Sequence, residues 1–132
     1  VAESATITGC VTLNKDFHKD ILAVERYEHY TGTNEAIVRS LLSNKQAVVG
    51  TYKKRFTKAR AYRIVGQDKI WINRAKISRS DSALTGTMIH ERLHVLGYSH
   101  KGNNRNKYNN INSVPYKVNY LSQKYYKGCL GD

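Results

Sequence analysis

The chain has 132 residues, of which 40% are hydrophobic and 24% charged, a composition typical of a single globular domain spanning residues 1–132. No stretch approaches the roughly 20 consecutive apolar residues that a membrane-spanning helix needs. The 22 Lys and Arg against 10 Asp and Glu give a net charge of +12, which indicates attraction to anionic surfaces, polymers or acidic substrates. A basic surface that is simply exposed to solvent would give the same net charge.

The chain begins at Val1 without an initiator Met, so we expect a mature or trimmed product. Its two cysteines, Cys10 and Cys129, lie near opposite ends. A disulfide between them is typical of secreted domains and predicts an extracellular or periplasmic location, whereas two free thiols would suit an intracellular protein. In the chain-entropy model, a bridge closing so long a loop contributes roughly 4–5 kcal/mol.

The first half of the chain contains two predicted helices followed by three predicted strands. In the second helix Thr33 can act as the N-cap, and apolar side chains form one stripe. Basic and aromatic residues interleave in YKKRFTKARAYR, a pattern also found on surfaces that stack nucleic-acid bases. A half-exposed strand shows the same alternation, so we do not expect the protein to bind nucleic acid. The predicted helices are 17–30 and 33–44; the predicted strands are 47–56, 61–66 and 69–74, with a hairpin turn at Gln67 and Asp68.

The second half contains two predicted helices separated by a long polar, Asn-rich loop over residues 99–113. The first helix is capped by Ser80 or Ser82 and runs to about Leu96, where Gly97 suits a left-handed C-terminal cap. The last runs from Pro115 to Lys127, with Ser113 as its cap and Gly128 at its end. Helices, then strands, then helices predict an α+β domain.

The string HERLHVLGYSH, residues 90–100, contains three histidines and a glutamate. His90 and His94 are four residues apart, so on a helix both imidazoles can reach one ion. Glu91 is rotated about 100° from His90 and lies beside that ion, where it can accept a proton from water and pass it to a leaving amine. HExxH strings also occur as solvated charge patterns, so the short motif alone does not establish a metal site.

The pattern continues beyond HExxH. A left-handed Gly97 would end the helix and turn the chain back, so that His100 can return to the same ion as a third ligand. Three nitrogens with one open position are typical of catalytic zinc sites.

The full string HExxHxxGxxH resembles that of the metzincin zinc metallopeptidases. The resemblance implies that His90, His94 and His100 bind Zn²⁺ and that Glu91 is the general base. It further implies an α+β fold with a small mixed β-sheet, a zinc-binding active-site helix and a C-terminal helix. In that fold an antiparallel edge strand, here residues 61–66, pairs with the substrate backbone, although an ordinary edge strand covered by a loop fits the same residues.

The family's methionine turn is atypical here, because the single methionine, Met88, precedes His90. The segment NSVPYKV, residues 112–118, is similar to the Ser-x-Met-x-Tyr turn of astacins and serralysins, with Val114 or Pro115 in the methionine position. By the same resemblance, Tyr116 would contact the zinc and stabilise the oxyanion. His18 and His29 lack spacing with the zinc string, and we interpret them as surface or capped residues.

These patterns predict a secreted, monomeric zinc metalloendopeptidase that hydrolyses peptide or protein substrates. One alternative is a hydrolase of cell-wall or surface peptides, held on anionic polymers by its basic charge. Another is a non-catalytic, zinc-stabilised binding module for acidic polymers. The loop over residues 101–112 would shape one side of the cleft, or is simply solvated.

Overall fold

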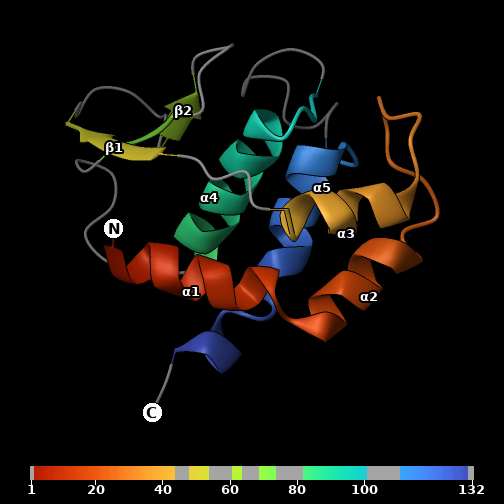
Figure 1. Cartoon of the computed structure of the whole chain (residues 1–132), viewed down its shortest axis with the longest axis horizontal. Helices are drawn as coiled ribbons and strands as arrows, with labels where there is room; N and C mark the ends of the chain where they lie inside the picture. Colours follow the sequence, from red (N-terminus) through yellow and green to blue (C-terminus); the bar gives the residue numbers. More distant parts are fainter. Residues whose placement is uncertain are drawn as a thin grey trace.

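The structure, a computed structural model, describes residues 2–43, 48–53, 61–63, 69–73, 82–100 and 111–130. Figure 1 shows helices packed side by side with short strands at one end. The described residues form five α-helices of eight to fourteen residues: α1 (Ala2–Thr12), α2 (Lys15–Ala23), α3 (Asn34–Leu41), α4 (Ser82–Val95) and α5 (Val114–Gln123). The same part of the chain contains three strands of three to five residues, β1 (Val48–Tyr52), β2 (Ala61–Arg63) and β3 (Lys69–Asn73), and a 3₁₀ helix, η2 (Lys127–Cys129), after α5.

The α+β, metzincin-like fold class expected from the sequence is wrong, because the described part of the chain is mostly helical. All five helices contribute to one hydrophobic core, whereas Ile70 of β3 is buried outside this cluster. The helices therefore pack against one another around a shared apolar core. The core residues are Ile7, Val11, Phe17, Ile21, Tyr27, Ile37, Leu41, Ile89, Leu93, Val114 and Val118.

Helix α1 was not predicted, since its sequence is rich in threonine and β-branched residues and contains Gly9. Its buried face includes Thr8 and Thr12, which are polar and so are not predicted as core residues from hydropathy. The hydroxyl of Thr12 bonds back to the carbonyl of Thr8 at 2.8 Å, and the hydroxyl of Thr8 reaches the sulfur of Met88 on α4 at 3.7 Å. Tertiary packing therefore stabilises a helix with low intrinsic propensity.

Helices α2 and α3 begin at side-chain caps. The carboxamide oxygen of Asn14 accepts hydrogen bonds from the backbone N–H groups of Asp16 and Phe17. The hydroxyl of Thr33 accepts one from the N–H of Ala36 at 3.1 Å, which confirms the predicted cap. Helix α2 ends at Ala23, seven residues before the predicted end at residue 30, because the chain becomes extended at Val24.

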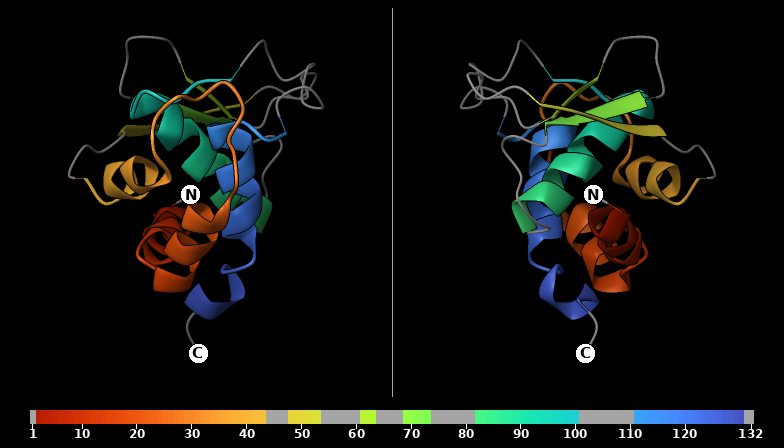
Figure 2. Two further views of the ribbon diagram at one scale, coloured as in Figure 1. Left: turned by 90° about the vertical axis from the view of Figure 1, so that its right-hand side faces the viewer. Right: turned by 90° about the vertical axis from the view of Figure 1, so that its left-hand side faces the viewer.

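The strands pair in the order β1–β3–β2. β1 is parallel to β3 and β2 is antiparallel to it, so that β2 lies at one edge, with Tyr62 opposite Trp71. β2 and β3 contact α4, and the strands lie at the end of the molecule opposite η2 (Figure 2). The predicted turn at Gln67 and Asp68, and the predicted strand residues beyond the observed bounds at 47, 54–56, 64–66 and 74, lie outside the described residues.

The C-terminal region differs in detail from its prediction. α5 runs over Val114–Gln123, so it does not reach Gly128, which lies inside η2. Ser113 takes the N-cap position, but its buried hydroxyl makes no capping bond. The predicted disulfide between Cys10 and Cys129 is present, with 5.8 Å between the two Cα atoms, and it joins α1 to η2. Within the described ranges, no helix has the length and apolarity to cross a membrane.

Candidate metal centre

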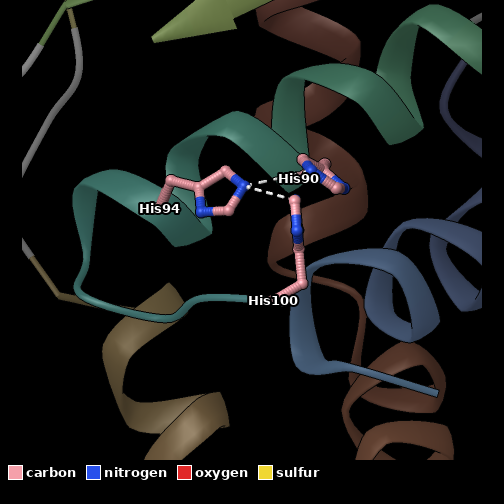
Figure 3. A group of neighbouring side chains, drawn as sticks. All are labelled: His90, His94 and His100. Carbon is pink, nitrogen blue, oxygen red and sulfur yellow. Dashed lines mark hydrogen bonds between the residues drawn. The ribbon is translucent and has the colours of Figure 1, made fainter. Parts of the chain in front are cut away.

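Three histidines meet at the C-terminal half of α4 (Figure 3). The Nε2 atom of His94 lies 3.1 Å from that of His90 and 3.2 Å from that of His100. Tetrahedral zinc with Zn–N bonds of 2.0–2.1 Å places its ligand nitrogens roughly 3.3–3.4 Å apart. The converging nitrogens therefore fit a single ion of this size, and within the described residues this cluster could hold a metal.

Gly97 makes the return of His100 possible. Its φ of +104° lies in the left-handed region, as predicted. The N–H of Gly97 bonds to the carbonyl of His94 at 3.1 Å, and the N–H of Tyr98 bonds to the carbonyl of Leu93 at 2.9 Å. This pair of bonds is the Schellman motif, which closes α4 and reverses the chain. His100 follows three residues later, beside the helix that it has just left.

The environment favours the neutral form of His90 and orients the ring of His94. Burial lowers the pKa of His90 to about 3, helped by the nearby His94 and His100, and the Pro115 backbone only partly opposes the shift. Nδ1 of His94 lies 2.9 Å from the carbonyl oxygen of Tyr98. Because a carbonyl only accepts, Nδ1 carries the proton there and Nε2 presents its lone pair to the cluster.

Glu91 and Tyr116 lie next to the histidines. Glu91 is 9% exposed and follows His90 in α4. Tyr116, in the first turn of α5, has its ring centroid 4.6 Å from that of His90 and 4.8 Å from that of His100. Burial raises the pKa of Tyr116, and the charge of Glu91 raises it further, so the phenol keeps its proton. All five residues predicted for the site therefore lie in one place.

Other predicted residues take different positions. Val114 is the first residue of α5 and packs into the core, so this segment begins a helix where a methionine turn was expected. His18 is half-buried and bonds to the carbonyl of Thr12 at 2.6 Å, while His29 is exposed, and both lie outside the cluster. Of the predicted loop over residues 101–112, only 111 and 112 are described.

Two hollows lie outside the histidine cluster. One of about 860 Å³ lies between α2 and α5, with Lys117 and Lys124 on one side and Asp20 and Glu25 on the other. A second of about 270 Å³ lies under the turn that follows α4 and includes Tyr98 in its wall. Neither of these two hollows is lined by a histidine of the cluster.

Sequence reasoning missed the roles of the Tyr98 backbone, which ends α4 and bonds to His94. A Schellman motif assigns the N–H bond by position after the glycine, so the place of Gly97 was the available signal for that bond, whereas no sequence signal marks the bond to His94.

No protein-family model matches the chain, and neither a curated protein nor a solved structure matches it. The conclusion that stands on the structure is a three-histidine cluster, with His90 buried, that could hold a metal ion. The disulfide is typical of proteins from oxidising compartments.

Proposed function

We propose that the protein is a zinc-dependent endopeptidase of the kind marked by the string HExxHxxGxxH. The observation that carries the proposal is the convergence of the Nε2 atoms of His90, His94 and His100. Three imidazoles are the protein ligand set of several catalytic zinc sites, which keep one position for water or substrate.

The three histidines would hold Zn²⁺ through these Nε2 atoms. When bound, Zn²⁺ supplies a Lewis acid that polarises a scissile carbonyl and activates water. The low pKa of His90 supports metal binding, because a neutral imidazole has a free lone pair at neutral pH.

Glu91 would move the proton. Its position directly after His90 in α4 supports this role, because a carboxylate there would lie next to the bound ion without being one of its ligands. The carboxylate accepts a proton from the attacking water and donates it to the nitrogen of the leaving amine. The buried position of Glu91 supports this role, since proton transfer benefits from exclusion of bulk solvent.

Tyr116 would donate a hydrogen bond to the oxyanion that forms as water attacks the carbonyl carbon. Its raised pKa supports this role, because the phenol remains a donor at neutral pH. The edge strand β2, which contacts α4, would pair with an extended substrate through its outer N–H and C=O groups.

The test is cleavage of a mixed peptide library by the zinc-loaded protein, with and without a chelator, and by the Glu91→Gln variant. We expect cleavage to be lost with chelator and lost in Glu91→Gln, while that variant still binds zinc. Glu35→Gln, which removes a carboxylate from the exposed start of α3, serves as the control and should cleave normally. Cleavage that persists in Glu91→Gln would contradict the proposal.

The second candidate is a hydrolase of surface-attached peptides, and the charge distribution favours it. Residues 44–81 contain 11 Lys and Arg against two Asp, and β2 and β3, which lie within this stretch, contact α4. An anionic polymer would be attracted to this part of the chain. Binding to an acidic polymer that persists at moderate salt, together with faster cleavage of peptides coupled to it, would support this candidate.

A zinc-stabilised binding module without catalysis is the third candidate. The net charge of +12 favours it, and it needs no general base. It would bind the same acidic polymer with undiminished affinity in Glu91→Gln and would cleave no peptide in the library.

A further inference from the structure

Tyr98 uses both of its backbone groups at the histidine cluster. Its N–H bonds to the carbonyl of Leu93 at 2.9 Å and ends α4, and its carbonyl accepts from Nδ1 of His94 at 2.9 Å. One residue therefore fixes both the point where the helix stops and the orientation of a ring on its last turn.

The Tyr98 side chain is held by other parts of the fold. Its hydroxyl lies 2.9 Å from the hydroxyl of Ser40 on α3. Its ring packs on the ring of Tyr30, with centroids 5.5 Å apart, and against the hydrophobic core. Helix α3 is in turn fixed by Ile37 and Leu41, which are both buried in that core. The Tyr98 carbonyl is thus positioned by the core through α3.

We propose that Tyr98 is the positioning residue for His94 and that it prepares the site for metal before metal arrives. This inference rests on the proposed zinc site and adds a residue outside the ligand set. A free imidazole exchanges between two tautomers and rotates about its last side-chain bond. The carbonyl of Tyr98 selects the Nδ1–H tautomer and aims Nε2 at His90 and His100. The ligand therefore needs no reorientation when the ion binds.

The experiment measures Zn²⁺ affinity by competition with a chelator in three variants of the full chain. Tyr98→Ala removes the ring and the hydroxyl, Tyr98→Phe removes the hydroxyl alone, and Ser40→Ala removes its partner. We expect affinity to fall about 10–100-fold in Tyr98→Ala, the range for the loss of an outer-shell partner, and less in the other two. Both Tyr98→Phe and Ser40→Ala break the bond between these two hydroxyls, but Tyr98→Phe also removes the hydroxyl's interaction with Tyr30, so its loss of affinity should be at least as large.

The matched control is Tyr125→Phe, which removes a half-buried tyrosine hydroxyl bonded to Asp20, outside the histidine cluster. It should bind zinc like the wild type. The second readout is the NMR signal of the His94 ring in the metal-free protein, which reports whether Nδ1 or Nε2 carries the proton. A residue that only stabilises the fold would leave this signal unchanged, whereas we expect Tyr98→Ala to increase the Nε2–H form.

Wild-type affinity in Tyr98→Ala, with His94 still protonated at Nδ1, would overturn the inference. If Tyr98→Ala does not fold, wild-type affinity in both Tyr98→Phe and Ser40→Ala overturns it equally. A wild-type protein that binds no zinc would remove the proposed function and this inference together. A wild-type protein that binds zinc but cleaves no peptide would remove the peptidase alone, and the affinities of the variants still decide the role of Tyr98.

Discussion

Tyr116 brings a phenol to within ring contact of both His90 and His100, on the first turn of α5. Tyr116→Phe keeps that ring packing and removes only the donor. If the phenol stabilises the oxyanion, kcat should fall by about 10²–10³, the usual loss for one oxyanion donor, with zinc affinity unchanged. Steady-state kinetics on a peptide selected from the library measure this change in kcat. Tyr120→Phe, which alters an exposed tyrosine on the same helix, should keep full activity, and full activity in Tyr116→Phe would exclude the role.

His90 makes the stability of the metal-free protein depend on pH. Its pKa is about 3 in the folded state because the ring is buried, against about 6.5 in the unfolded chain. Between these values the unfolded state binds the extra proton, so the free energy of unfolding should fall on acidification below about pH 6.5. One group contributes at most about 1.4 kcal/mol per pH unit in this window.

Denaturant unfolding of the metal-free protein from pH 7.5 to pH 4 checks this dependence. The slope should be shallower in His90→Asn. His29→Asn is the matched control, because His29 is exposed and asparagine tolerates its φ of +58°. Equal slopes in both variants would show that His90 is not the titrating group.

Gly97 decides where α4 ends, and its φ of +104° suits glycine alone among common residues. Gly97→Ala should lower the free energy of unfolding by about 1–2 kcal/mol and weaken zinc binding, because His100 depends on the turn. Gly9→Ala, at an exposed position in α1 with no atom near the new methyl group, should instead stabilise by about 0.5–1 kcal/mol. Unfolding curves and zinc titrations measure both, and an unchanged zinc affinity in Gly97→Ala would contradict this account.

The elements that the sequence predicts well are those set by local chemistry. The Thr33 cap, the Gly97 turn and the meeting of His90 with His94 depend on neighbours within a few residues, and each is present. Helix α1 depends instead on contacts with residues distant in sequence, such as that of Thr8 with Met88, so no local pattern predicts this helix. The predicted fold class was wrong for the same reason, because local sequence patterns do not indicate which elements form the core.

The disulfide between Cys10 and Cys129 links the two end regions of the chain, because these cysteines are 119 positions apart in sequence. This bridge fastens α1, and α1 packs on α4, which carries two of the histidines. Removing a native disulfide from a small domain costs about 2–5 kcal/mol, and a loop of this length lies at the upper end in the chain-entropy model.

The double variant Cys10→Ser/Cys129→Ser should therefore unfold at a clearly lower denaturant concentration than the oxidised wild type. A reductant should bring the wild type to the same midpoint and leave the double variant unchanged. The folded double variant should still bind zinc, because the cluster is assembled by α4 and its Schellman turn rather than by the chain ends. A wild type whose midpoint ignores reductant would mean that the bridge adds no stability, and the core alone would then hold α1 in place.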